Sequence, residues 1–448
     1  MAAAMMSKLT RSILLTTALA VLTAPLHAET LRLSLHDAVS MALREGTVAR
    51  LARSQEERAT IAQREALSGL FPQSEARLMR YNESINLATF GFELPGLPPV
   101  IGPFDVVDAQ VTAAMQLFNL AALRYYQASR AGAEASRFHF QQAQNDVTVT
   151  VSRLYVLVQR ADAQVAAREA NVTLFTELAR VANDEFKAGT GTRLDVAQAN
   201  VQLARTKEAL LRAQNDRQSA RLALLNAIGA DQSSELVLAD PLGPPHAVPA
   251  VDAALTTARE QRPELKELQA AEKQAELTLS SARARRVPRV ELSFQGDYGG
   301  FDTDHLHSSR RIAGAVAVPI FRGDINANIA RAKLELEDVR TRASSIQRDV
   351  EQQVRTSLLS LENAQARVDV AGESAKVAED ALTIARERKS AGYGSAVEVD
   401  RAEDVYRQAH EDLIAAQADA ALAYYQLQHA TGTIGALAPP VTPETAAQ

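Results

Sequence analysis

The sequence contains no cysteine and no tryptophan, and aromatic residues make up only 5% of its 448 residues. Without cysteine the chain cannot form disulfides, thiolate metal sites, a cysteine nucleophile or a lipid anchor on cysteine. The formal net charge is −6, so there is no polybasic excess of the kind that predicts nucleic-acid binding. Ala, Leu, Gln, Glu and Arg dominate instead, which is typical of long helices packed through small side chains.

Only one long apolar run is present, and it lies at the N-terminus. Lys8 and Arg11 precede the apolar segment 12–24, and Pro25 and Ala28 follow it. This order predicts a secretory signal peptide, residues 1–28, that is cleaved after Ala28. The alternative is a retained anchor helix, but the run of 13 residues is short against the ~20 needed to span a bilayer. The mature chain is therefore expected to be either soluble in the periplasm or inserted in the outer membrane as strands.

The rest of the chain is a tandem duplication. Short segments recur at a constant spacing of 203 positions, for example Gly189-Thr-Gly191 with Gly392-Tyr-Gly394, and Leu194-Asp-Val196 with Val397-Glu-Val399. Such a fixed period indicates an internal repeat. The predicted boundaries are a first repeat 29–239, a Pro-rich linker 240–250, a second repeat 251–432 and a flexible tail 433–448.

Each half is predicted to run in the same order of helix, strand, strand, very long helix, tight turn and helix. Apolar residues from Val147 to Phe186 alternate steps of four and three, broken only by Arg168, which is a coiled-coil pattern. The long helix, from about Ala121 to Lys187, would extend ~100 Å at 1.5 Å per residue. Periodicity alone also fits any other antiparallel coiled coil.

Four segments of roughly 8 to 11 residues are predicted to be strands. They are 73–81, 108–118, 289–296 and 311–320. The last three alternate apolar and polar residues, whereas the first alternates poorly. Such alternation fits transmembrane strands, but it also fits a soluble sheet with one buried face. Four strands cannot close a barrel, and open edges are not tolerated in lipid. Three chains together would supply twelve strands, enough for a pore.

Three segments resemble the TolC-like outer-membrane efflux protein family. They are the turn-helix segments 188–199 and 391–402 and the motif Val318-Pro-Ile-Phe-Arg-Gly323. The resemblance covers nearly the whole mature chain and implies a mainly α fold with a small β part. It also implies a homotrimer, a 12-stranded barrel among the outer-membrane lipids and a helical tube that extends through the periplasm.

The resemblance implies a passive exit duct for small molecules, with a periplasmic adaptor and an inner-membrane transporter as partners. The same duct could serve type I protein secretion, and a non-channel periplasmic scaffold is the remaining alternative. The segments 82–107 and 297–308 would be extracellular loops. The periplasmic tips that dock the adaptor would contain Lys187, Gly189, Gly191, Arg193, Gly392 and Gly394. The entrance gate would contain Asp195, Glu398 and Arg401, of which Glu398 and Arg401 fall on two positions that are acidic in the family.

No catalytic, cofactor or metal site is predicted. The two Gly-x-Gly segments lack the third glycine and the Lys-Ser/Thr ending of phosphate loops, and they lie between helices. His305 and His307 are interpreted as solvated loop residues rather than metal ligands. The acidic residues Glu398, Asp400, Glu403 and Asp404 are interpreted as a solvated helix start. The chain is therefore not expected to be an enzyme.

Overall fold

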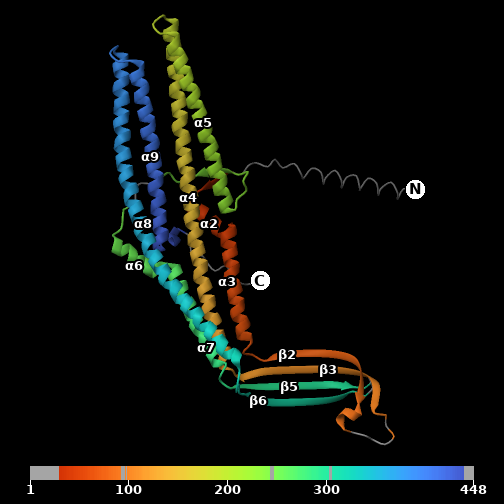
Figure 1. Cartoon of the computed structure of the whole chain (residues 1–448). Coiled ribbons are helices and arrows are strands. Elements are labelled where there is room, and N and C mark those ends of the chain that lie inside the picture. The colour runs from red at the N-terminus through yellow and green to blue at the C-terminus, as the bar shows by residue number, and fades with distance from the viewer. Residues whose placement is uncertain (1–29, 92–95, 97, 243–246, 302–304, 438–448) are drawn as a thin grey trace, which may run out of the picture.

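The computed structural model describes residues 30–91, 96, 98–242, 247–301 and 305–437. Figure 1 shows a long arm of helices with a four-stranded sheet at one end. The predicted signal peptide lies outside the described residues. None of the helices described is both long enough and apolar enough to cross a membrane.

The two halves contain helices of equal length in the same order. The first half contains α2 (Leu35–Glu45), α3 (Thr47–Ser68), α4 (Leu120–Lys187) and α5 (Arg193–Ile228). The second half contains α6 (Val251–Gln261), α7 (Pro263–Ala284), α8 (Gly323–Ser390) and α9 (Ala396–Thr431). Counterparts have 11, 22, 68 and 36 residues. The duplication and the mainly helical fold predicted from the sequence are therefore confirmed.

Each half begins with two short helices rather than the single helix predicted. The break in the first half lies at Gly46, whose extended backbone ends α2 and precedes α3. In the second half Pro263 occupies the first turn of α7. Backbone N–H groups in the first turn have no partner within the helix, so the N–H that proline lacks costs no hydrogen bond there. Proline disfavours the helical conformation for the residue before it, and Arg262 accordingly has an extended backbone.

The four-stranded sheet is antiparallel, in the order β2-β3-β5-β6. Its strands are β2 (Gln73–Asn86), β3 (Val100–Phe118), β5 (Arg289–Gly300) and β6 (His307–Ala317). The poorly alternating segment is thus a strand, and it lies at one edge. The strand predicted over 311–320 ends earlier, at Ala317. Pro319 has no N–H to donate, so it cannot continue the ladder.

The connections between the strands are shorter than the predicted loops 82–107 and 297–308. The hairpin of β2 and β3 continues past Asn82, whose side chain donates to Asp105 Oδ1 across the ladder at 2.9 Å. A short 3-10 helix, η1 (Leu87–Phe90), follows β2. The sequence prediction was wrong here because polar residues such as these pair with one another across the strands instead of marking a loop.

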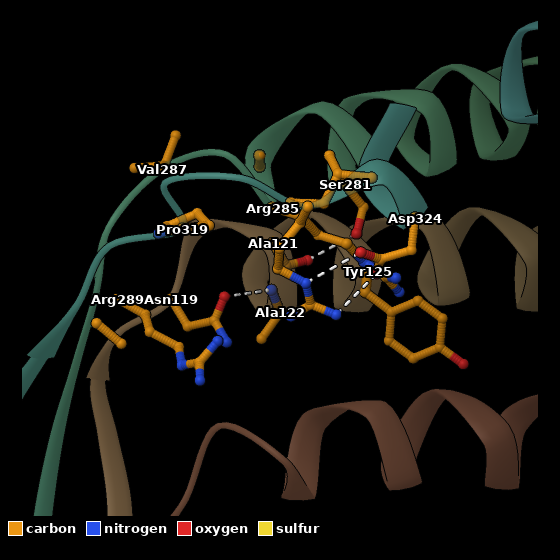
Figure 2. A pocket seen from close by; sticks show the side chains of 14 residues that line it. Asn119, Ala121, Ala122, Tyr125, Ser281, Arg285, Val287, Arg289, Pro319 and Asp324 are labelled. Atoms are coloured by element: carbon orange, nitrogen blue, oxygen red, sulfur yellow. Dashed lines mark hydrogen bonds and ion pairs between the residues drawn. The ribbon is translucent and has the colours of Figure 1, made fainter. Parts of the chain in front are cut away.

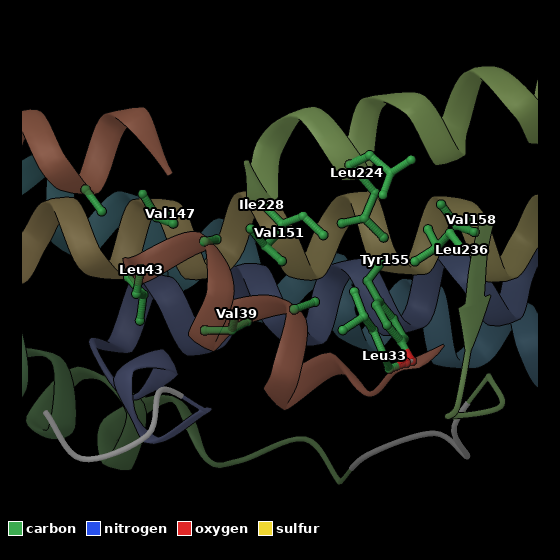
Figure 3. Close-up of a cluster of buried hydrophobic side chains, with 14 residues drawn as sticks. Leu33, Val39, Leu43, Val147, Val151, Tyr155, Val158, Leu224, Ile228 and Leu236 are labelled. Atoms are coloured by element: carbon green, nitrogen blue, oxygen red, sulfur yellow. The ribbon is translucent and has the colours of Figure 1, made fainter. Parts of the chain in front are cut away.

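A pair of short parallel strands was not predicted. The strands β1 (Thr30–Leu33) and β4 (Glu235–Leu238) join the two ends of the first half. They lie beside a buried cluster formed by α2, α4 and α5, shown in Figure 3. Leu224, Ile228 and Val158 in this cluster are fully buried. Each such side chain contributes roughly 1.5–3 kcal/mol to folding. A corresponding apolar cluster joins α6, α8 and α9.

Tyr155 ties the first-half cluster to the start of the linker. Its hydroxyl donates to Leu33 O at 3.1 Å and contacts Asp240 Oδ2 at 3.2 Å. The same carboxylate accepts the Leu35 backbone N–H at 2.8 Å. Burial, followed by the nearby Asp240 charge, raises the pKa of Tyr155 to about 12, so the phenol remains a neutral donor. The first residue of the predicted linker is therefore fixed to the body of the protein.

Arg168, which interrupts the apolar stripe of α4, has a partner in the other half. Its Nη2 lies 2.9 Å from Glu411 Oε2 on α9, and both side chains are mostly buried. Arg407 is 3.5 Å from the same carboxylate. The interruption is therefore a polar contact between the two halves of the duplication.

The predicted flexible tail begins later than residue 433. Residues Ile434–Leu437 form a 3-10 helix, η2, and Ile434 is fully buried. Leu437 O is 3.1 Å from His36 Nδ1 of α2. The sequence boundary was wrong because burial of one isoleucine side chain holds this turn in place; residues 438–448 lie outside the described residues.

Candidate functional site

The sheet has one polar and one apolar face. Paired positions of neighbouring strands share a face, and the register aligns Gln295 with Arg311 and Thr112. The polar face carries Gln73, Glu75, Arg77, Gln110, Thr112, Glu291, Ser293, Gln295, Asp297, Ser309 and Arg311. The opposite face carries Ala76, Leu78, Ala109, Val111, Val290, Leu292, Phe294, Ile312 and Val316. Arg80 and Arg310 interrupt the apolar face, in the half of the sheet remote from the helices.

Large side chains on the apolar face are not covered by the rest of the chain. Leu78, Ile312 and Val316 are 79%, 69% and 67% exposed. Strands β2 and β6 each have a neighbour on one side only. This part of the chain therefore presents an apolar surface and two strand edges with unpaired backbone groups.

At the other end of the arm, α4 and α5 meet in the tight turn that contains Gly189 and Gly191. Gly189 has φ +80°, which favours glycine. Two successive N–H groups, of Thr190 and Gly191, donate to Glu185 O. A Cβ on Gly191 would lie 3.1 Å from Phe186 N, so a side chain there would force the turn to shift.

The turn between α8 and α9 repeats this geometry. Gly392 also has φ +80°. The N–H groups of Tyr393 and Gly394 both donate to Arg388 O at 3.0 Å. A Cβ on Gly394 would lie 2.9 Å from Lys389 N. The glycines predicted at the tips thus form two equivalent turns at the far ends of the two helical hairpins (Figure 1).

The tips carry exposed cationic and apolar side chains. Lys187 and Arg193, which were predicted to belong to the tips, are exposed. The sequence reasoning missed the apolar members Leu194, Tyr393 and Val397, which are 64%, 84% and 57% exposed. Leu194 and Val397 hold equivalent positions in the first turns of α5 and α9. The internal repeat could have revealed Leu194 and Val397. Both are apolar, they hold equivalent positions in the two halves, and neither belongs to the apolar stripe that packs the coiled coil.

The three predicted gate residues have different environments. Asp195 completes a capping box, in which its Oδ2 accepts from Thr192 N at 2.8 Å and Thr192 Oγ1 at 2.7 Å. These hydrogen bonds lower the pKa of Asp195. The equivalent Glu398 is exposed, and the structure gives its side chain no hydrogen bond or ion pair within the described ranges. Arg401 is also exposed and forms no ion pair with Glu398 in these ranges.

Glu403 is a buried exception in the acidic segment that was interpreted as solvated. It is 3% exposed and packs between α9 and α8, where Oε1 lies 3.2 Å from Arg386 Nη2. Its Oε2 is buried without a hydrogen-bond partner. Burial raises the pKa of Glu403, and the Arg386 interaction offsets part of that rise. The prediction was wrong here because Glu403 lies on the face of α9 that packs on α8, with Val399 one turn earlier.

No group of three or more His, Asp or Glu side chains that could hold a metal is found in the described ranges. A sheet with an apolar face and open edges, continuous with a long helical arm, is the protomer architecture of outer-membrane channel proteins. The chain belongs to the outer membrane efflux protein family, whose model matches residues 102–230 and 254–433. Members of this family are channels rather than enzymes.

One relative in sequence and several solved structures are similar to this chain, and their names are consistent with this family. The outer membrane efflux protein BepC of Brucella suis biovar 1 (strain 1330) is 26% identical over 283 residues, which cover 61% of this chain and 60% of BepC. The alignment thus spans less than two thirds of that relative. The fold resembles VceC of Vibrio cholerae, with 18% identity, a TM-score of 0.75, and coverage of 89% and 96% of the two chains. It also resembles the open state of the MtrE channel of Neisseria gonorrhoeae, with 21% identity, a TM-score of 0.75, and coverage of 89% and 88%.

The family assignment confirms the predicted location. The protein is an outer-membrane protein, and the helical arm is its periplasmic extension.

Proposed function

We propose that three copies of this chain assemble into a duct that passively conducts small molecules across the outer membrane. A periplasmic adaptor and an inner-membrane pump would deliver these molecules. The observation that carries the proposal is the open sheet, with one polar face, one apolar face and free edges on β2 and β6.

Unpaired strand edges are the reason to expect several copies. In lipid, each unsatisfied backbone group costs several kcal/mol, so an open four-stranded sheet is unstable there. Pairing β2 of one copy with β6 of the next would remove every edge. Three copies would close twelve strands, which is wider than the eight-stranded barrels whose interiors side chains fill. The polar faces would then line an aqueous passage.

The tips are the proposed docking surface for the adaptor. Leu194, Tyr393 and Val397 expose apolar surface beside Lys187 and Arg193, and the turns below them are held by paired backbone hydrogen bonds. A rigid apolar anchor with charged surroundings is a common arrangement at protein interfaces. Glu398, with Asp195 and Arg401, is proposed to line the entrance between the tips.

The test measures assembly and conduction on the same preparation. Light scattering on the detergent-solubilised protein, corrected for detergent, is expected to give the mass of three mature chains. The same material is expected to form stable pores in a planar bilayer. A stable monomer, or a trimer that does not conduct, would overturn the proposal.

A further inference from the structure

A pocket of about 410 Å³ lies where the sheet meets the helical arm. Figure 2 shows it between the start of α4, the end of α7 and the start of α8. This volume falls within the ~300–1,000 Å³ typical of small-molecule sites. Its lining includes Asn119, Tyr125, Arg285, Arg289, Arg322 and Asp324.

The pocket has an excess of positive charge. Arg322 is neutralised by Asp324, with Nη2 2.7 Å from Oδ2. For Arg285 and Arg289 the structure gives no ion pair or side-chain hydrogen bond among the residues that it describes. Two guanidinium groups with free donors therefore remain at the pocket. Such groups bind phosphate and carboxylate oxygens in bidentate fashion.

The strand register indicates the side on which the pocket opens. Arg289 pairs with Ala317, and both belong to the pocket lining. Arg289 shares its strand face with Glu291 and Ser293, which lie on the polar face of the sheet. In the proposed trimer that face borders the passage, so the three pockets would surround it just below the barrel.

We propose that this pocket binds the anionic group of a solute in transit, a phosphate or similar oxyanion held between Arg285 and Arg289. The inference rests on the proposed function and names a cargo class for it, anionic small molecules. Asn119, Ala121 and Ala122 bring the amino-terminal turn of α4 to the pocket. That helix end adds a favourable partial positive charge. The exposed Tyr125 ring borders the same space and offers a further hydrogen-bond donor.

The probe is inorganic pyrophosphate, titrated calorimetrically into the detergent-solubilised wild-type assembly. Saturable binding that weakens with added salt is expected. The double variant Arg285→Gln/Arg289→Gln should weaken binding by roughly 100-fold, because two charge-assisted contacts are removed. The matched control is Arg283→Gln, a neighbouring exposed arginine outside the pocket lining, which should bind as wild type does. Light scattering verifies that all three proteins assemble alike.

Absence of binding to wild type, or equal binding by the double variant, overturns the inference. If pores conduct while pyrophosphate does not bind, only this inference fails. If pyrophosphate binds but no pore conducts, the proposed function fails, and with it the cargo assignment. Phospholipid that copurifies with wild type but not with the double variant would assign the pocket to a lipid headgroup and also overturn the cargo assignment.

Discussion

Carboxyl groups within the short segment 398–404 of α9 have contrasting environments. Glu398 is exposed and unpaired within the described ranges, Glu403 is buried against Arg386, and Asp404 forms an exposed ion pair with Arg407 at 3.3 Å. Only a carboxylate that is free of local partners can contribute its full charge to a passage. Asp195, the counterpart of Glu398, is committed to its capping box. Among these groups Glu398 is therefore the strongest candidate for a gate charge.

Glu398→Gln is expected to abolish a weak cation preference of the reconstituted pore. Three copies of the carboxylate would share one narrow entrance, where low-dielectric walls strengthen their field. Arg401→Ala should increase the preference, because it removes a nearby positive charge. The measurement is the reversal potential under a salt gradient, with Asp404→Asn as the control. An unchanged reversal potential for Glu398→Gln would show that this residue does not line the entrance.

Acidification is expected to stabilise the tip of the α8–α9 hairpin through Glu403. Its pKa in the folded protein is raised above the ordinary value of 4.5, so the folded state binds the proton more tightly than the unfolded state. The resulting stability is present at low pH and is lost as pH rises through the raised pKa. Amide exchange in residues 396–410, corrected for intrinsic rates, should therefore slow as the pH falls from 7 through that raised pKa.

The variant Glu403→Gln separates the contribution of Glu403 from that of Asp400. Burial also raises the pKa of Asp400, so both carboxyl groups stabilise the folded state at low pH. The variant should lose most of the pH dependence while Asp400 supplies the remainder. A pH dependence equal to that of wild type would assign the effect to other groups.

Among the elements, the two tip turns depend most directly on glycine. A residue with a side chain in the left-handed region costs roughly 1–2 kcal/mol, and β-branched residues fit it poorly. Both turns use this conformation at their first glycine, whereas the second glycine is needed for close backbone approach. The backbone shape of the tips therefore depends on these glycines.

Gly189→Val/Gly392→Val should abolish export and crosslinking to the adaptor while trimers remain in the membrane. Reversal of charge at Lys187 and Arg193 is expected to do the same without altering the turns. Gly372→Ala serves as the control, since a Cβ there would meet only Leu413 Cδ1 at 4.0 Å. Export of a fluorescent substrate and crosslinking yield are the measurements. Survival of both activities in the glycine variant would show that the tips are not the docking surface.

The long helix of the first half was predictable from the sequence to within a residue at each end, because a constant 203-residue period and a long apolar stripe define it. The predicted start Ala121 and end Lys187 compare with Leu120–Lys187 in the structure. The pair β1 and β4 was not predictable, since four-residue strands 205 positions apart have no local pattern. At the tips the turn glycines could be predicted from their spacing. The burial of Glu403 could not, because it depends on how α9 packs against α8.

At the scale of the whole molecule, the sequence also predicts how the mature protein begins. Residues 1–28 are expected to be removed, so that N-terminal sequencing of the protein begins at Glu29. The protein should be recovered from the outer-membrane fraction and extracted only by detergent, because the apolar face of its sheet would be exposed to lipid in the proposed barrel. A processed form that remains soluble in water would contradict the barrel prediction.

The duplication has a geometric consequence for any partner that binds the tips. Three copies would present six hairpin ends in a ring that looks sixfold from a distance. Its chemistry would nevertheless be threefold, because Asp195 is tied within its own turn whereas Glu398 is not, and Thr190 replaces the exposed Tyr393. A partner built from six identical subunits would therefore meet two alternating surfaces. It would need either two modes of contact or a ring that itself alternates.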